Sequence, residues 1–460
     1  MHSVRSLAPY CCVLAILAIF TLPSWAEDGL HTEDGLHTED SLHTEDRPYN
    51  LPIGDAERRD QQATLVLDGI TATHDGALLT PSELVERLKS TRILLVGESH
   101  TSEEFHRVQE IVLRELHRAG RRVVVGLEMM PSDAQASLDR WVAGELSEAE
   151  YLEVGEWYLH WGYPWEYYRA IFQTARRLGM PMRGLNVPRE LVTAVRMEGF
   201  EGLDEDSRKR LPPDIQPSDD AHTRLFLSYF DDDSGMHSMD DETLEGFLRA
   251  QSAWDASMGW SAIQSLEALG WKDDPALILV VLVGSGHVAY GHGIERQAAP
   301  WFDGEITTLI PVPIASDGEA IDSVSASYAD FVWGVQEERW TRFPSLGIST
   351  RAHDGEGGGR SVLFVDEKSP AASLELEGGD ILLTLDGSPI DDAVTVRRLM
   401  ATKHWGDTVD VTWRRDDTVH TGTVFLRRTV ESEAEEAEET GESEEAEESV
   451  EAEESVEAEE

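Results

Sequence analysis

The chain has 460 residues and a formal net charge of −51 at pH 7, from 89 acidic and 38 basic residues. This length allows two or three domains, and so strong an acidic excess argues against a nucleic-acid partner. The charge is uneven, because residues 431–460 hold 17 Glu and residues 27–46 hold eight acidic residues, with no Lys or Arg in either segment. Even without these segments the rest of the chain is acidic.

Residues 1–26 predict a secretory signal peptide. Arg5 gives a short basic start, and residues 11–22 form an apolar stretch too short to span a bilayer comfortably. Ser24 and Ala26 then supply the small residues that precede a cleavage site. An uncleaved membrane anchor is the alternative. We expect export across the inner membrane to the periplasm or cell envelope.

The chain has two cysteines, Cys11 and Cys12, and both lie inside the predicted signal peptide. Neither follows the small residues in the way a lipid-anchored cysteine would, so we do not predict a lipoprotein. A mature protein without thiols can form no disulfide and no covalent c-type haem link. Any metal would therefore be held by nitrogen, oxygen or thioether ligands.

Residues 27–62 are predicted to be an acidic repeat linker, and residues 429–460 a disordered acidic tail. The linker opens with the repeat "EDGLHTEDGLHTEDSLHTED", in which one Leu per six residues cannot build a core. Its recurring His residues leave open a weak divalent-metal site. In the tail, Glu repels Glu at helical spacing with no Lys to relieve it, so a stable helix is not expected.

Residues 63–320 predict an α/β domain with a mostly parallel sheet flanked by helices. Short strands are expected in "TLVLDG" and "TATHDGALLT", and a helix is expected to begin after Thr80, with Pro81 and Glu83 as start signals. The buried run "ILLV" predicts the next strand, and a helix follows it from residue 102 to 117. Further apolar runs predict strands in "RRVVVGLEMM", "MPMRGLNVPRE", "ALILVVLVGSGHVAYGHG" and "EITTLIPVPI".

Four of these strands end in glycine followed by a polar or ionisable residue. Because the carboxyl ends of parallel strands share one edge of a sheet, we expect these side chains to converge there. They are Glu98, His100, Glu128, Asn186 and His287. Taken singly, each has a structural explanation as a helix cap or a core imidazole.

The converging residues suit two kinds of chemistry, and the sequence does not choose between them. His100, Glu128 and His287 could bind a divalent metal such as zinc or iron. Alternatively, Glu98, His100, Glu128 and His287 could share protons and activate water for acyl hydrolysis. Whether the protein is an enzyme therefore stays open.

Several ordered motifs between about residues 64 and 313 resemble the ChaN family of haem-binding, iron-uptake-associated envelope proteins. They are "LLVGESHTSEEFHRVQ", "GLEMMPSDAQASLDRWVAG", "WGYPWEYYRAIFQTARRLGMPMRGLNVPRE", "QSAWDASMGWSAI" and "VGSGHVAYGHGI". This family shares a superfamily with the erythromycin esterases and the TraB/Tiki proteins. In the hydrolytic members, the segments matching Glu98, His100, Glu128 and His287 form the active site. The resemblance implies haem as the cofactor.

The stretch "EWYLHWGYPWEYYRAIF" supplies candidate haem residues. A thiol-free protein could offer haem iron a phenol or an imidazole, so Tyr163, Tyr167, Tyr168 and His160 are the candidates. A core cap over the sheet is the alternative explanation for most of these aromatic side chains.

Residues 338–428 resemble a PDZ domain over nearly its full length, in motifs such as "FPSLGIST" and "SVLFVDEKSPAASLELEGGDILLTLDGSPI". Leu346, Gly347 and Ile348 match the loop that binds a chain terminus, so we expect a peptide or protein C-terminus as partner. A small β-rich domain that only packs on the first is the alternative. No chymotrypsin-like "GDSGG" segment precedes it.

Three functions are therefore compatible with the sequence. The first is an exported haem- or iron-binding protein with a peptide-docking domain. The second is a hydrolase of the Tiki or erythromycin-esterase type, and the third is a scaffold that acts through its PDZ domain. The sequence leaves open a homodimer.

Overall fold

The computed structural model describes residues 48–230, 239–314, 323–338, 340–353, 355, 357–366 and 369–428. The predicted signal peptide, the acidic repeat and the acidic tail lie outside the described residues. The chain divides into two compact units, Met1–Arg342 and Phe343–Glu460. Strands β9 and β10, which lie beyond residue 320, belong to the first unit.

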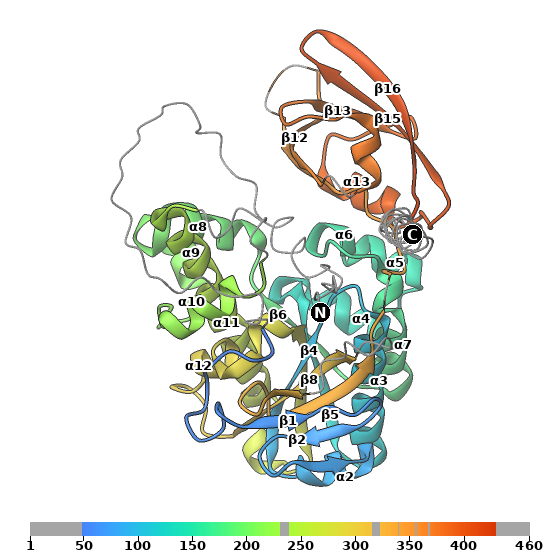
Figure 1. The fold of residues 1–460 in the computed structure, drawn as a ribbon. Coiled ribbons are helices and arrows are strands. Elements are labelled where there is room, and N and C mark those ends of the chain that lie inside the picture. The colour runs from blue at the N-terminus through green and yellow to red at the C-terminus, as the bar shows by residue number, and fades with distance from the viewer. Residues whose placement is uncertain are drawn as a thin grey trace, which may run out of the picture. The chain divides into compact units, whose positions relative to one another are not determined.

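The first unit is built on an eight-stranded, mostly parallel sheet, which confirms the predicted fold class (Figure 1). Its strand order is β3-β2-β10-β8-β4-β7-β5-β6. Neighbours from β10 to β6 run parallel, while β2 pairs antiparallel with both β10 and β3. The bounds are β2 Ile70–Ala72, β3 Ala77–Leu79, β4 Thr91–Glu98, β5 Arg122–Pro131, β6 Met182–Asn186, β7 Leu277–Gly284, β8 Glu305–Ile314 and β10 Phe331–Gln336.

Helices connect the parallel strands and cover the sheet. Helix α2 (Pro81–Arg87) begins at Thr80 with the predicted capping box, and α3 (Glu103–Arg118) buries one apolar face. Helix α11 (Asp241–Ala268) is instead buried on nearly all sides. The others are α4 Gln135–Val142, α5 Glu148–Val154, α6 Trp157–His160, α7 Arg169–Leu178, α8 Arg189–Gly202, α9 Glu205–Lys209, α10 Asp220–Leu227 and α12 Ile294–Ala298. No helix in the described residues is both long and apolar enough to cross a membrane.

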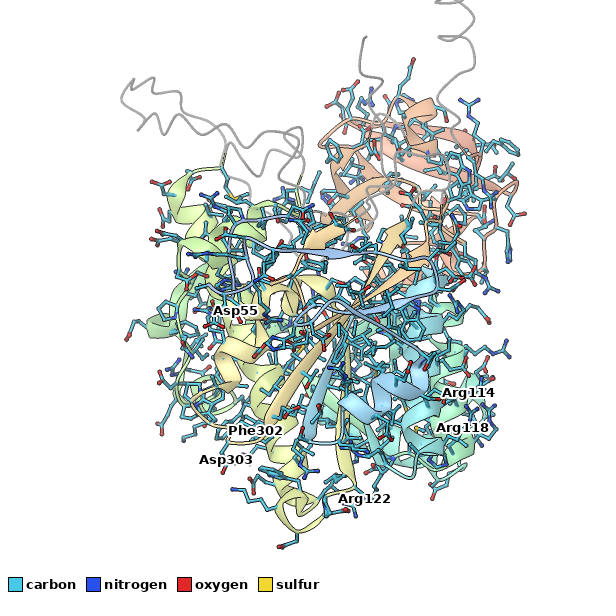
Figure 2. The ribbon with its side chains drawn as sticks, turned by 60° about the horizontal axis from the view of Figure 1, so that its bottom comes forward. Asp55, Arg114, Arg118, Arg122, Phe302 and Asp303 are labelled. Atoms are coloured by element: carbon cyan, nitrogen blue, oxygen red, sulfur yellow. The ribbon has the colours of Figure 1, made fainter. Side chains whose placement is uncertain are left out.

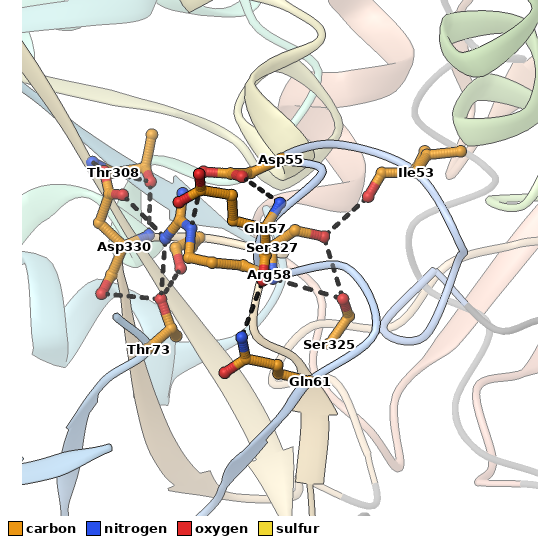
Figure 3. Close-up of polar contacts among 11 residues, drawn as sticks. Ile53, Asp55, Glu57, Arg58, Gln61, Thr73, Thr308, Ser325, Ser327 and Asp330 are labelled. Carbon is orange, nitrogen blue, oxygen red and sulfur yellow. Dashed lines mark hydrogen bonds and ion pairs between the residues drawn. The ribbon is translucent and has the colours of Figure 1, made fainter. Parts of the chain in front are cut away.

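A polar network ties the N-terminal segment to the sheet (Figure 3). The Arg58 guanidinium reaches the Asp55 carboxylate at 3.1 Å, Thr73 Oγ1 at 3.2 Å and the Asp330 carboxylate at 3.3 Å. Asp330 also accepts hydrogen bonds from the backbone and side chain of Thr308 on β8. Beside this network, β1 (Gln62–Thr64) pairs antiparallel with β9 (Ser323–Ser325). Four separate chain segments are therefore joined near one end of β8.

The amino-terminal edge of the sheet carries surface ion pairs. Arg122, at the start of β5, lies 3.1 Å from the Asp274 carboxylate, and Lys272 lies 3.6 Å from that of Asp303 (Figure 2). These side chains are largely exposed, so each pair contributes little to stability.

The segment after β10 returns to the start of α3. The Glu338 carboxylate accepts hydrogen bonds from the Ser102 hydroxyl and, at 3.3 Å, from the Glu104 backbone N–H. Arg342 adds an ion pair with Glu103 at 2.7 Å. The helix therefore begins with a carboxylate supplied from far along the chain, which its partial positive charge favours.

The second unit is a small β-rich domain with its own core. Its sheet has the order β11-β12-β13-β15-β16, with β14 paired to β13, and helix α13 (Ala393–Met400) lies alongside. The strands are β11 Ile348–Ala352, β12 Arg360–Val365, β13 Ile381–Leu385, β14 Ser388–Pro389, β15 Thr408–Arg415 and β16 Thr418–Phe425. Leu346, Val362, Trp413 and Val424 are among its buried residues.

Candidate functional site

The carboxyl end of β4 places a buried carboxylate, Glu98, among several donors. Its Oε1 lies 2.8 Å from His100 Nδ1 and accepts a 2.6 Å hydrogen bond from the Tyr168 hydroxyl. Its Oε2 accepts one of 2.7 Å from Gln109 and lies 3.5 Å from His106 Nε2. Burial alone would raise the pKa of Glu98, but the two imidazoles outweigh burial and hold the pKa well below its usual value. Glu98 is therefore ionised.

His100 is the partly exposed member of this group, with 16% of its side chain accessible. Its ring packs edge-on against Trp161, at 4.9 Å between ring centres, and at 5.0 Å from Tyr163. Burial would lower the pKa of His100, but the hydrogen bond to Glu98 and the charge of Glu128 raise it.

A second carboxylate–imidazole pair follows on β5 and β7. Glu128 Oε2 accepts a 2.6 Å hydrogen bond from the Gly284 backbone N–H, and its Oε1 lies 3.4 Å from His287 Nε2. Burial would raise the pKa of Glu128, but His287, His100 and the Gly284 N–H together lower it. Asn186 on β6 donates to the Glu128 backbone carbonyl at 3.1 Å, so it braces the strand end.

Asp255 on α11 contacts the His287 ring on the side opposite Glu128. This residue was not predicted from the sequence. Its Oδ1 lies 2.6 Å from His287 Nδ1, and the carboxylate is fully buried. Burial would lower the pKa of His287, but Asp255 and Glu128 raise it to about 10. His287 is therefore a cation held between two carboxylates at neutral pH. Gln251, one helical turn before Asp255, also lies 2.9 Å from His287 Nδ1.

His222 on α10 lies behind Asp255, with its Nε2 3.7 Å from Asp255 Oδ2. Burial lowers the pKa of His222 to about 4, although Asp255 opposes the shift, so this imidazole is neutral. Asp255 Oδ2 has no hydrogen-bond partner among the described residues. The Asp255 carboxylate therefore stabilises mainly the charged form of His287.

Gly284 lies where the two pairs meet. A Cβ at this position would lie 3.3 Å from His100 Nε2 and 3.6 Å from Glu128 Oε2. The structure therefore brings Glu98, His100, Glu128 and His287 together at one edge of the sheet, on either side of a glycine. Among the described residues, no group of three or more His, Cys, Asp or Glu side chains has an arrangement that could hold a metal ion.

The haem candidates occupy different environments. Tyr168 is fully buried and its hydroxyl donates to Glu98, while Tyr167 is buried beside His106. Tyr163 is half-buried next to His100. Tyr168 could therefore reach iron only by giving up its hydrogen bond to Glu98.

His160, at the end of α6, is half-buried and lines a hollow of about 440 Å³ with Arg140, Val154 and neighbouring residues. Val154 and Leu159, which both precede it in sequence, are 48% and 45% exposed. Burial lowers the pKa of His160 although nearby acids, Asp133 first, oppose it. Its imidazole is therefore neutral at pH 7 and has a nitrogen lone pair free to bind a metal.

In the second unit, Leu346, Gly347 and Ile348 lie in the loop that leads into β11. Gly347 has a φ of +73°, and its N–H donates to Ser345 Oγ at 3.1 Å. Leu346 is buried in the core, and Ile348 begins the edge strand β11. A peptide carboxylate that binds the Gly347 N–H would have to share this donor with the Ser345 hydroxyl or displace the hydroxyl.

Two protein-family models match the chain. Residues 84–297 match the family described as haem-binding uptake, Tiki superfamily, ChaN, and residues 344–426 match the PDZ domain. No curated protein matches the chain.

The chain is also similar to several solved structures. A structure of ChaN from Campylobacter jejuni with cofacially bound haem is 18% identical, with a TM-score of 0.44, over 57% of this chain and 95% of that one. A PDZ domain from Listeria monocytogenes is 23% identical, with a TM-score of 0.15, over 17% of this chain and 82% of that one. An HtrA-type protease with a decapeptide is 22% identical, with a TM-score of 0.19, over 21% of this chain and 32% of that one.

The two family models bear out the resemblances carried by the sequence motifs. Both lie within the limits of the two compact units. Residues 84–297 therefore match a ChaN-like haem-binding domain, and residues 344–426 match a PDZ domain.

Proposed function

We propose that this protein is an exported haem-binding protein of the cell envelope that docks a peptide at its PDZ domain. The family model supports haem, and the pattern of residues 1–26 supports export. The observation that carries the haem proposal is the neutral, accessible imidazole of His160 beside exposed apolar side chains. These residues fit the group, because haem needs an apolar surface and an axial nitrogen or oxygen ligand.

His160 is the proposed axial ligand, with Tyr163 as the alternative. Val154, which lines the hollow, and the exposed Leu159 next to His160 in sequence would cover the porphyrin face. Arg140 in the same hollow, which lies 3.5 Å from the Glu145 carboxylate, could pair with a propionate instead. Bound haem would supply an iron centre whose properties depend on its axial ligand and on solvent access. The hydrogen bonds that Glu98 accepts from Tyr168 and Gln109 would stay in place on binding.

Haemin titration of the full-length protein tests this assignment. The wild type should give a shifted, saturable Soret band, and His160→Ala should weaken binding at least about tenfold, equivalent to ~1.4 kcal/mol. Tyr163→Phe should bind normally, as should the control His117→Ala, which removes an exposed imidazole on α3. Loss of binding in Tyr163→Phe alone would make the phenol the ligand.

A hydrolytic function is the second candidate, favoured by the two buried carboxylate–imidazole pairs around Gly284. In this case the neutral form of His100, the partly exposed member, would take a proton from water while Glu98 fixes its ring. Wild-type protein with no saturable haemin binding, but with ester or peptide hydrolysis that His100→Ala abolishes, would establish this function instead.

Peptide docking at the second unit is supported by the free position of β11 at one end of the described sheet. An extended peptide could add to this strand through backbone hydrogen bonds and place its terminal carboxylate in the loop at Gly347. Val396, Leu399 and Met400 on α13 are only partly buried and offer an apolar side to the groove. We expect binding in the micromolar range, about 8 kcal/mol in free energy.

A peptide library with apolar C-termini tests this docking mode. Free-acid peptides should bind at least about tenfold more tightly than their amides, because only a carboxylate accepts well from the loop N–H groups. Gly347→Ala should abolish binding, since the position has a positive φ and a Cβ would lie 2.0 Å from Ser369 Cβ. Equal affinity for acids and amides would show that the loop does not read a carboxylate.

A further inference from the structure

Strand β16 is the other terminal strand of the second unit's sheet, at the opposite edge from β11. Among the described residues it pairs only with β15, in an unbroken register from Thr408↔Phe425 to Arg415↔Thr418. Its outer edge therefore presents the outward-pointing backbone N–H and C=O groups of alternate residues, which pair with no other described strand.

Proteins usually protect such edges with charged residues, proline or a bulge. The sequence of β16, "TVHTGTVF", has no Lys, Arg, Asp, Glu or Pro, and its pairing has no bulge. Two of its apolar side chains are exposed, Val419 at 57% and Phe425 at 53%. The chain has a net charge of −51, which makes most of its surface repel a second copy. The eight residues of β16 carry no charge, so this edge does not add to that repulsion.

Charges of opposite sign lie at the two ends of this strand. Asp416 and Asp417 precede it, Arg427 and Arg428 follow it, and all four side chains are exposed. If a second copy of the strand paired antiparallel, the acidic end of each copy would face the basic end of the other. A parallel copy would set like charges against each other, which is unfavourable.

We propose that β16 pairs antiparallel with β16 of a second copy, with Gly422 at the two-fold axis. In this register Val419 of each copy lies opposite Phe425 of the other, so the exposed apolar side chains cover each other on one face. Asp416 and Asp417, in the turn before the strand, then face Arg427 and Arg428 of the other copy, which follow it. The contact is isologous and closes at two copies.

The pairing leaves β11 unobstructed, because β11 and β16 are the two ends of the same sheet. Each copy could therefore still take up a peptide. One strand pair is a small interface, so we expect a dissociation constant on the order of 10 μM. The end charges select the antiparallel orientation, and reversing the charge at one end would set like charges against each other.

Sedimentation velocity of the full-length protein at physiological salt tests the pairing through charge reversal. The wild type should be in concentration-dependent equilibrium between monomer and dimer. Asp416→Lys/Asp417→Lys makes both ends of the strand basic, and Arg427→Glu/Arg428→Glu makes both ends acidic. Each variant alone should dimerise at least tenfold more weakly, and an equimolar mixture should recover a dimer of the two variants.

The matched control for the lysine variant is Glu242→Lys/Glu245→Lys, which makes the same change in net charge at exposed positions of α11 and should dimerise like the wild type. Circular dichroism would show that each variant is folded. A wild type that stays monomeric well above the expected dissociation constant would overturn the proposal. So would charge variants that dimerise unchanged, or a mixture that fails to associate.

Discussion

Replacing Asp255 by Ala should lower the free energy of unfolding by about 3–5 kcal/mol at neutral pH. The substitution leaves the buried His287 imidazolium without the carboxylate that lies 2.6 Å from it. The measurement is urea unfolding of the wild type and the variant. Glu245→Ala on the exposed side of the same helix is the control and should change stability by no more than about 0.5 kcal/mol.

The difference in free energy of unfolding between the wild type and Asp255→Ala should decrease as the pH rises. The folded pKa of His287 is raised to about 10, above its ordinary value of 6.5, so its protonation stabilises the fold. This stabilisation is complete below about pH 6.5 and is lost progressively as the pH rises towards about 10. The gap between the two proteins should therefore narrow from pH 6.5 upward. A gap that is constant or widens would contradict a cationic His287.

Gly293→Ala should destabilise the first unit by about 3 kcal/mol or more, whereas Gly259→Ala should be neutral or slightly stabilising. A Cβ on Gly293 would lie 2.2 Å from the His287 carbonyl oxygen, a backbone atom that cannot move away cheaply. A Cβ on Gly259, inside α11, would make ordinary contacts of 3.4 Å or more with α12. Alanine there also favours the helix by up to about 1 kcal/mol.

Thermal unfolding of both variants beside the wild type would measure this contrast. The two glycines contact the same short helix, so a general sensitivity of that region would affect both alike. Equal destabilisation in the two variants would show that the close approach at His287 is not the cause.

The strands and their ends could be predicted because hydrophobic runs closed by glycine carry a strong local signal. Residues 93–96 and 277–284 are continuous apolar runs, as expected for central strands covered on both faces. Glu98, His100, Glu128 and His287 follow directly from the parallel topology. The strand β10 escaped prediction, because "FVWGVQ" is short and its place between β2 and β8 depends on long-range pairing.

Asp255 could not be found in the same way, because it lies on a helix that is distant in sequence from every strand end. Helix α11 is buried on nearly all sides, so no polar face marks where its side chains point. One signal was present, since Asp255 is the only charged residue between Arg249 and Glu267. A single acid in so apolar a helix needs a partner, and the fold supplies His287.

The hydrogen bonds that Glu338 accepts at the start of α3 limit where the chain can be cut between its two units. Glu338 comes after the last strand of the first sheet, yet it caps the helix that begins three residues beyond His100. A shortened chain ending at Gln336 would keep every strand of the first sheet but lose this cap, and the turn beside His100 would fray. Dissection of the protein into its domains should therefore cut after Arg342, so that the helix start keeps both Glu338 and the ion pair with Glu103.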